Sequence, residues 1–487
     1  MTGCKKGRSD PALFVLPVAT CVTSVPHSMW VSKGGGLDSA GIGILEIDGR
    51  KIPTFTETER IGRLAFVCVE FQPHPMVQFV HVENMDSAPS AIPTRSWTRL
   101  DGVDLLRALA IFFVLMNHVN MRLLIGKVPY LKGLSHQLAN SLVWNGQPGV
   151  QIFFAASGFL ITSTALRRWG SLARVSVRDF YLLRFARIAP LLLVLLALLS
   201  VLHLAHLNDF VVRAKTGGLG RALLAALTFH VNVLEARRGY LPGNWDILWS
   251  LSVEEMFYLF FPLVCYVAGR GKLFVALLVA FVVLGPFGRT ALAHGNEVWR
   301  EYSYLSGMDA IALGCLTAMF AARRQLARPA LMALGGTGIA LLVLNLCLSI
   351  RAYAWELGRY GLDFTILALA TCMVIAAAAQ SKWRSPRVFA PFLLLGHRSY
   401  EVYLTHMFVV FGFYHLFLLA GKPMWAVPLL FLTVILFAGF LGELVARYYS
   451  EPMNRWLRTR MGDGPERLGS MIEAERITAQ DGNRVAV

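Results

Sequence analysis

The chain has 487 residues, of which 55% are hydrophobic and only 16% are charged, and its mean hydropathy is +0.53. A soluble globular protein carries roughly 25% charged residues. This composition, with apolar runs recurring from Leu105 to Ala446, therefore excludes a soluble fold for most of the chain. The 46 Lys and Arg exceed the 30 Asp and Glu and give a net charge of +16, whose distribution decides whether a nucleic-acid partner is implied.

The first 95 residues differ from the rest of the chain. They contain three consecutive glycines at 34–36, scattered prolines and no apolar run long enough to span a bilayer. Met85 opens a short polar leader directly before the apolar region, which makes it a candidate for the natural start. We predict an N-terminal appendage over residues 1–95, poorly ordered or partly upstream of the natural start, a membrane domain over 96–460 and a polar tail over 461–487.

Ten apolar segments have the length that a transmembrane helix needs, about 20 residues. They lie at about 104–122, 148–167, 188–207, 247–268, 273–293, 305–321, 330–350, 360–380, 399–420 and 425–447. An eleventh segment, 220–236, is shorter and is interrupted by His230 and Asn232. The pattern predicts an all-α polytopic membrane protein with about ten transmembrane helices.

The basic residues cluster in alternate loops between these segments. The clusters are Arg167, Arg168, Arg174, Arg178, Arg184 and Arg187, then Arg270 and Lys272, then Arg323, Arg324 and Arg328, then Lys382, Arg384 and Arg387. If residues 220–236 spanned the membrane, the later clusters would face outward, against the positive-inside bias. We therefore predict that 220–236 is re-entrant or interfacial and that both termini are cytoplasmic. Topology then explains the basic excess, and no nucleic-acid partner is predicted.

The first span carries ionisable residues, which are functional candidates inside a membrane because burying a charge there is costly. Arg107 and His118 are 11 residues apart, so three helical turns place them on nearly one face, about 16 Å apart. Asp104 lies three residues before Arg107 and can pair with it. A buried packing histidine is the alternative interpretation of His118.

Two adjacent carboxylates, Glu254 and Glu255, enter the apolar segment 247–268. Neighbouring helical side chains point about 100° apart, so at most one of them is expected to face a given cavity. The predicted topology places them in the same outer leaflet as His118, where they could meet it. The alternative is an interfacial helix end, with Trp245 and Trp249 in an aromatic belt.

Arg184 and Arg187 stand at the expected cytoplasmic mouth of the third span. Residues at i and i+3 share a helix face, and two guanidinium groups form a forked donor array suited to phosphate or carboxylate. The alternative interpretation is that both arginines only anchor the helix end on the positive side of the membrane.

Together these residues resemble the motifs of a known family. Arg107 and His118 form an Arg-x10-His motif after the lead-in Asp104-Leu105-Leu106. The other motifs are Phe153-Phe154-Ala155-Ala156-Ser157-Gly158-Phe159-Leu160-Ile161, Arg184-x-x-Arg187, Trp249-Ser250-Leu251 with Glu254-Glu255 and Phe257-Tyr258, and Ser399-Tyr400-x-x-Tyr403-Leu404-x-His406. Over residues 95–460 the chain is similar to the acyltransferase 3 family of integral-membrane acyltransferases. Leu105 departs from the family, which commonly has Gly there.

The resemblance implies an O-acetyltransferase that moves an acyl group, usually acetyl, from cytoplasmic acyl-CoA to a hydroxyl of a cell-surface carbohydrate, such as lipopolysaccharide O-antigen or exopolysaccharide. His118 is then the general base, with a covalent acyl-histidine left open, and Glu254 or Glu255 orients its ring or binds acceptor hydroxyls. The donor-binding candidates are Arg107, Arg184 and Arg187. The candidates for support or pore lining are Asp104, Ser157, Trp249, Ser250, Tyr258 and His406.

The expected partners follow from the same resemblance: acyl-CoA, a carbohydrate or glycolipid acceptor and the bilayer of a bacterial inner membrane. No permanently bound cofactor is expected, and the seven cysteines form no CxxC pair that would indicate a zinc site. Acylation of a small lipophilic metabolite such as a macrolide stays open. A transporter is the alternative of another class, but the sequence has no internal repeat between its halves.

Overall fold

The computed structural model describes residues 100–461, except 133–134, 270–271, 294, 349–356 and 382, and six short strands between residues 42 and 79. The chain divides into two compact units, Met1–Trp97 and Thr98–Val487, which we describe separately. The predicted Met85 start, most of the predicted appendage and the tail after residue 461 lie outside the described residues.

The first unit contains three antiparallel pairs of strands. β1 (Ile42–Ile47) pairs with β2 (Arg50–Phe55), with Ile42 opposite Phe55. The two shorter pairs are β3 (Glu59–Ile61) with β4 (Leu64–Phe66), and β5 (Cys68–Val69) with β6 (Gln78–Phe79). Among the described residues, strands occur only in this unit.

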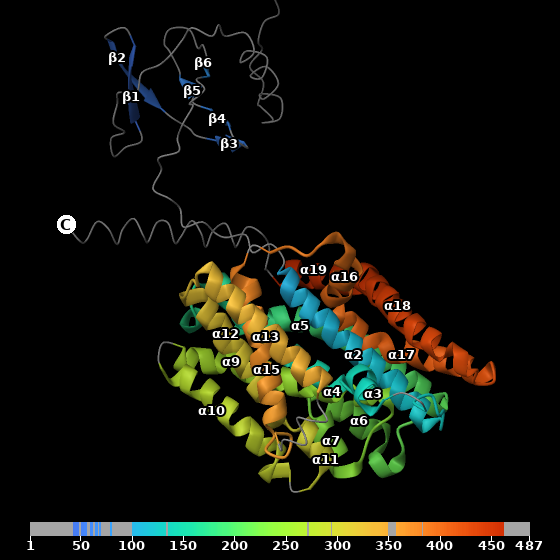
Figure 1. Ribbon diagram of the computed structural model, residues 1–487. Helices are drawn as coiled ribbons and strands as arrows, with labels where there is room; N and C mark the ends of the chain where they lie inside the picture. The colour runs from blue at the N-terminus through green and yellow to red at the C-terminus, as the bar shows by residue number, and fades with distance from the viewer. Residues whose placement is uncertain are drawn as a thin grey trace, which may run out of the picture. The chain divides into compact units, whose positions relative to one another are not determined.

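The second unit is a helical bundle whose described residues contain ten helices long and apolar enough to span a membrane (Figure 1), as predicted. They are α2 (Asp101–Ile125), α4 (Gly146–Trp169), α5 (Val177–Leu204), α9 (Leu248–Ala268), α10 (Lys272–Arg289), α12 (Tyr304–Arg323), α13 (Arg328–Cys347), α15 (Leu362–Gln380), α17 (Ser399–Leu419) and α18 (Val427–Val445). The chain is thus a multi-pass membrane protein.

Shorter helices connect the spans. The α-helices are α3 (His136–Val143), α6 (Gly218–Leu227), α7 (Val231–Arg238), α8 (Gly243–Asp246), α11 (Glu297–Tyr302), α16 (Ala390–His397) and α19 (Glu451–Arg460). Single turns are η1 (Leu172–Arg174), η2 (Asn208–Phe210), η3 (Ala214–Thr216), η4 (Ala291–Ala293), η5 (Arg387–Phe389), η6 (Met424–Ala426) and the π-turn η7 (Ala446–Ser450).

The segment 220–236 does not form a span, as predicted. It is divided between α6 and α7, and the break falls at Phe229, whose φ of 55° is in the left-handed region. The Thr228 hydroxyl donates to the carbonyl of Leu224 at 2.6 Å and so closes the end of α6. Neither helix reaches the length of about 20 residues that crossing a bilayer requires.

The third span begins earlier than the sequence indicated. We expected it from residue 188, but α5 starts at Val177, where the N-cap hydroxyl of Ser176 accepts from the amide of Asp179 at 3.3 Å. Arg184 and Arg187 therefore lie within the helix rather than in the preceding loop, and hydropathy misplaced the boundary because it scores both arginines as loop residues.

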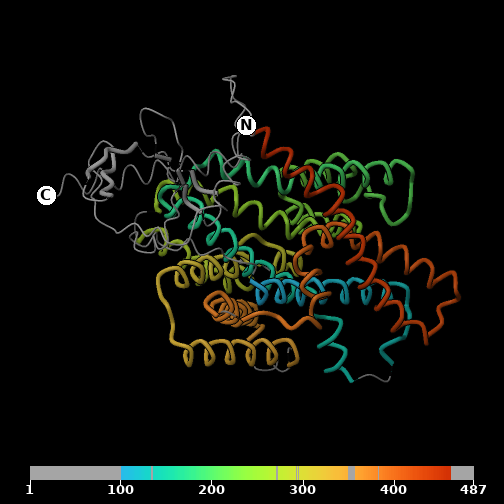
Figure 2. The backbone as a smooth tube through the Cα atoms, turned by 90° about the horizontal axis from the view of Figure 1, so that it is seen from above, coloured from blue at the N-terminus to red at the C-terminus, as the bar shows by residue number. Residues whose placement is uncertain are grey.

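Glycines set the close packing of α4 on α12, which lies inside the bundle, while α13 runs along its rim beside α15 (Figure 2). A Cβ added to Gly158 would lie only 2.0 Å from the carbonyl oxygen of Ile311. One added to Gly314 would lie 2.1 Å from the carbonyl oxygen of Ala155. Such close backbone approach is typical of small residues at helix interfaces in membranes.

A buried ion pair joins α10 to α12. Arg289 binds Asp309 through two contacts, Nη2 to Oδ2 at 2.6 Å and Nη1 to Oδ1 at 3.1 Å. The Thr365 hydroxyl of α15 donates to Asp309 Oδ2 at 2.6 Å. Both charged side chains are almost fully buried, so each depends on the other for compensation of its charge.

Candidate active site

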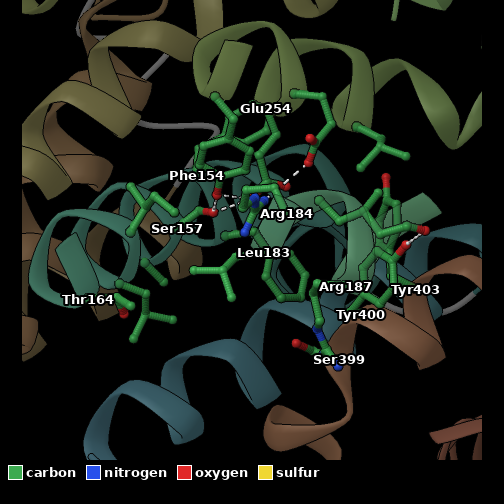
Figure 3. Close-up of a pocket in the computed structure, with 18 of the residues that line it drawn as sticks. Phe154, Ser157, Thr164, Leu183, Arg184, Arg187, Glu254, Ser399, Tyr400 and Tyr403 are labelled. Carbon is green, nitrogen blue, oxygen red and sulfur yellow. Dashed lines mark hydrogen bonds and ion pairs between the residues drawn. The ribbon is translucent and has the colours of Figure 1, made fainter. Parts of the chain in front are cut away.

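A cavity of about 310 Å³ lies between α2, α4, α5, α9, α17 and α19 (Figure 3). Its lining includes Arg107, Arg184, Arg187 and Arg458, together with Glu254 and Glu255. Arg107, Arg184 and Ser399 belong to the first halves of α2, α5 and α17, and Trp169 ends α4, so the cavity extends toward the bundle end where α2 begins. We call it the arginine cavity.

Arg184 is fixed from two sides. Its Nη2 lies 3.1 Å from Glu255 Oε1, and its Cζ lies 3.6 Å from the ring centre of Tyr258. The buried Nε of Arg184 has no hydrogen-bond partner among the described residues. Because an unpaired buried donor is costly, this atom is available to an anionic ligand.

Arg187 forms a separate ion pair with another carboxylate. Its Nη1 lies 3.1 Å from Oε1 of the buried Glu401, and its Cζ lies 5.3 Å from the ring centre of Tyr400. The two arginines share the cavity, as the i, i+3 spacing indicated, but they are neutralised separately. The predicted pairing of Asp104 with Arg107 is also present, at 3.4 Å.

Both glutamates line the arginine cavity, so the expectation that at most one would do so was wrong. Glu254 turns toward α4, where it accepts from the hydroxyl of Ser157, and it also accepts, at 2.6 Å, from the hydroxyl of Tyr258 on its own helix, α9. Glu255 turns toward Arg184 of α5. Neighbouring side chains leave α9 about 100° apart. Because the cavity extends from α4 to α5, Glu254 and Glu255 can both line it despite this angle. Figure 3 shows Ser157, Glu254 and Arg184 converging.

The aromatic-belt interpretation of this segment was also wrong. Trp245 is fully buried and Trp249 is only 4% exposed, whereas belt residues face the lipid interface. The Trp249 ring stacks on that of Tyr302, with centroids 4.0 Å apart and planes 5° from parallel. Trp249 therefore packs inside the protein, against the connection between α11 and α12.

His118 lines a second, smaller cavity of about 90 Å³, which we call the histidine cavity. The other lining residues are Val114, Asn117, Gly146, Gln147, Val150, Asp246, Ile247, Trp249, Glu301, Tyr302 and Tyr403. Val150 and Tyr403 line both cavities and therefore form the partition between them. The Tyr403 hydroxyl donates to the carbonyl of Ile247 at 3.0 Å and lies 2.6 Å from Ser250 Oγ, which fixes the ring at the partition.

The surroundings of His118 determine its tautomer. Its Nδ1 lies 2.8 Å from the carbonyl oxygen of Val114, and Nδ1 of His406 lies 2.6 Å from that of Tyr403. A carbonyl only accepts, so both Nδ1 atoms carry the proton. His406 Nε2 then accepts a second contact from His118 Nδ1, at 3.3 Å. His118 Nε2 is left unprotonated, in the state that a general base requires.

The sequence-predicted residues thus divide into two groups. Arg107, Arg184, Arg187, Glu254, Glu255, Ser157, Ser250 and Tyr258 line the arginine cavity, and His118 and Trp249 line the histidine cavity. His406 lines neither described cavity and supports His118 from behind. The hydrogen bonds of the glutamates go to other partners, so Val114 and His406 orient the imidazole.

Among the lining residues of the histidine cavity that sequence reasoning missed, three bear on its chemistry. Asp246 stands three residues before Trp249 in a segment already singled out, and an acid at that position was an available signal. Tyr302 and Glu301 precede the span that starts at Tyr304, and nothing in their local pattern distinguishes them from an ordinary loop. Only the fold brings them to His118.

Comparison with known proteins now identifies the family. A family model described as an acyltransferase domain, that of the acyltransferase 3 family, matches residues 100–444. The chain belongs to the acyltransferase 3 family. The matched region of this acyltransferase 3 chain contains His118, both partition residues and the arginine cavity except Asn454 and Arg458.

Similar proteins include O-acetyltransferase OatA of Staphylococcus aureus strain NCTC 8325 and the protein of the same description from strain COL. Each is 24% identical to the acyltransferase 3 chain over 379 residues, which is 73% of this chain and 57% of the relative. The chain therefore spans a little over half the length of these relatives. No solved structure matches it.

Proposed function

We propose that this protein is an O-acetyltransferase of the bacterial inner membrane, which moves acetyl from cytoplasmic acetyl-CoA to a hydroxyl of a cell-surface carbohydrate, in lipopolysaccharide O-antigen or exopolysaccharide. One observation carries the proposal: an arginine-lined cavity and a histidine-lined cavity share the partition residues Val150 and Tyr403. The family supports acyl transfer. The description of the relatives as O-acetyltransferases supports acetyl as the group.

The arginine cavity suits the donor. Acyl-CoA carries several phosphates and a thin pantetheine arm, and guanidinium groups bind phosphate through charge-assisted pairs. The unpartnered Nε of Arg184 is one such donor. The cavity's volume of about 310 Å³ suits the arm and the acetyl group, while the nucleotide stays near the mouth beside Trp169 and Arg458.

The positive-inside bias supports entry of the acyl donor from the cytoplasm. It places the start of α2 in the cytoplasm, and the arginine cavity extends toward that end of the bundle. His118 lies near the opposite end of α2, and the histidine cavity includes Gly146 at the start of α4. The acceptor would then enter from the outer side, and the acetyl group would pass the partition.

The chemistry follows from the free nitrogen of His118. Nε2 takes the proton of the acceptor hydroxyl while its oxygen attacks the thioester carbonyl carbon. The C–S bond of the tetrahedral intermediate then breaks, and the leaving thiolate takes the proton from His118. The products are an O-acetyl ester and CoA with a free thiol. Ser250 stands at the partition beside Tyr403, and its hydroxyl, turned from that of Tyr403, is the donor that we propose for the developing oxyanion.

The test is transfer of labelled acetyl from acetyl-CoA to envelope carbohydrate, in membranes that hold equal amounts of wild type or His118→Ala. Loss of the general base should lower transfer by about 10²-fold or more. His415→Ala is the matched control, because His415 is exposed and pairs with Asp209 outside both cavities. Full transfer by His118→Ala would place the base elsewhere, and no transfer by wild type would refute the donor or the acceptor.

A further inference from the structure

The two cavities differ in charge. The arginine cavity has four arginines in its lining. Of the twelve described residues that line the histidine cavity, Asp246 and Glu301 are acidic and none is lysine or arginine. A ligand that carries negative charge is repelled by such a lining, whereas a hydroxyl group can donate to it.

Two nearby arginines, Arg122 and Arg300, offset part of this negative charge but do not line the cavity. Arg122 extends from the same helix as His118, but it pairs with Asp209 at 3.5 Å and lies 4.0 Å from the ring centre of Phe411. Arg300 donates through Nη2 to the carbonyl of Gly358 at 2.9 Å. Neither side chain lines the histidine cavity.

A second acidic side chain, Glu235, lies close to Asp246. Glu235 is buried and accepts from the amide of Leu241 at 3.0 Å. Burial, and then the negative charge of Asp246, raise the pKa of Glu235 well above the ordinary carboxyl value. Glu235 therefore adds no second full negative charge beside Asp246, whose own carboxyl group lines the cavity.

A series of aromatic rings extends from the protein surface to the histidine cavity. Tyr240 is 59% exposed, and its ring centre lies 6.0 Å from that of Tyr302 in an edge-to-face arrangement. Tyr302 in turn stacks on Trp249, and both line the histidine cavity. Aromatic faces offer apolar contact to the C–H faces of a sugar ring, while the polar lining receives its hydroxyls.

The size of the cavity limits what enters it. A volume of about 90 Å³ corresponds to roughly three water molecules. It admits a hydroxymethyl group or one edge of a ring but not a whole sugar, which would remain along Tyr240 and Tyr302. The amides of Asn117 and Gln147 complete the polar lining on the side of α2 and α4.

From these contacts we infer that the histidine cavity is the acceptor subsite, that it takes a hydroxyl of an uncharged or amino sugar, and that Asp246 and Glu301 exclude sugars with a carboxylate beside that hydroxyl. The inference rests on the proposed function. It assigns Asp246 and Glu301 as specificity-determining residues, and Tyr240 with Tyr302 as the contact for the sugar face.

The test uses the full chain in detergent micelles, where both cavities are accessible, with labelled acetyl-CoA and three soluble acceptors: methyl glucoside, methyl glucosaminide and methyl glucuronide. Wild type should acetylate the first two with kcat/KM at least about tenfold above that for the glucuronide. Asp246→Asn and Glu301→Gln should each raise the glucuronide-to-glucoside ratio at least about threefold, with KM for acetyl-CoA unchanged.

Glu443→Gln is the matched control, because it removes a carboxylate outside both cavities and leaves Arg398 paired with Glu451. Equal use of glucoside and glucuronide by wild type, or a ratio that neither cavity variant changes, would overturn the inference while leaving acetyl transfer intact. No transfer of label to any acceptor, with no hydrolysis of acetyl-CoA, would overturn the proposed function and the inference with it.

Discussion

His406 Nε2 lies 3.3 Å from Nδ1 of His118, and the two rings are 4.9 Å apart between centroids. The two histidines come from α2 and α17, 288 residues apart in the chain. Because His406 is fully buried and lines neither described cavity, it contacts His118, the proposed base, rather than a substrate. It is a positioning residue for His118.

Replacement of His406 by Ala should therefore lower kcat by about tenfold, the effect of losing one hydrogen bond, without changing KM for acetyl-CoA. His406→Gln, which keeps an acceptor near His118 Nδ1, should recover part of the loss. The measurement is steady-state transfer at varied acetyl-CoA. An unchanged kcat in His406→Ala would show that Val114 alone orients the ring.

Arg184→Gln should raise KM for acetyl-CoA by about tenfold to a hundredfold, because a charge-assisted contact to phosphate is lost. Arg184→Lys should restore only part of the affinity, since Lys lacks the planar fork and the stacking on Tyr258. Arg323→Gln is the control, because Arg323 ends α12 outside both cavities. Equal KM values in Arg184→Gln and the control would remove Arg184 from the donor site.

Gly158→Ala should destabilise the bundle by about 1–3 kcal/mol, because the new methyl group would meet the backbone of α12. Gly336→Ala is a matched control, since a Cβ there meets no heavy atom within 4 Å. Thermal unfolding of both variants in detergent, followed by tryptophan fluorescence, measures the difference. Equal unfolding midpoints for the two variants would mean that α4 and α12 accommodate the added methyl group without loss of stability.

Asp309→Ala should destabilise by about 3–5 kcal/mol, because it leaves Arg289 buried without its carboxylate. The double variant Arg289→Met with Asp309→Leu should recover most of that loss, since no unpaired charge remains. The same unfolding assay, applied also to the single variants Arg289→Met and Asp309→Leu, completes the double-mutant cycle. A double variant less stable than Asp309→Ala would show that the pair stabilises the fold beyond charge compensation.

The number of spans and the short segment at 220–236 could be predicted because hydropathy and loop charge are local properties of the sequence. The start of α5 could not, since Arg184 and Arg187 read as loop residues until Glu255 and Glu401 compensate them inside the bundle. The buried pair Arg289 and Asp309 was missed for a similar reason: the two charges lie on separate helices, and only packing shows that they neutralise each other.

Prediction of the candidate site was limited in the same way. Motifs and spacing selected His118, Glu254 and Arg184 as chemical groups, but helix geometry alone could not assign them to cavities. Glu301 reaches the histidine cavity from a segment far along the chain. Its role depends on the path of α11 and α12 through the bundle, which no local pattern records.

The partition formed by Val150 and Tyr403 also bears on the permeability of the membrane. If the two cavities open to opposite faces of the membrane, as the proposed function requires, a connection between them would let protons and small ions cross. A valine and a hydrogen-bonded tyrosine ring between them provide a seal that holds while either cavity is empty. On the proposed function, group transfer and an intact ion gradient would then depend on the same two side chains.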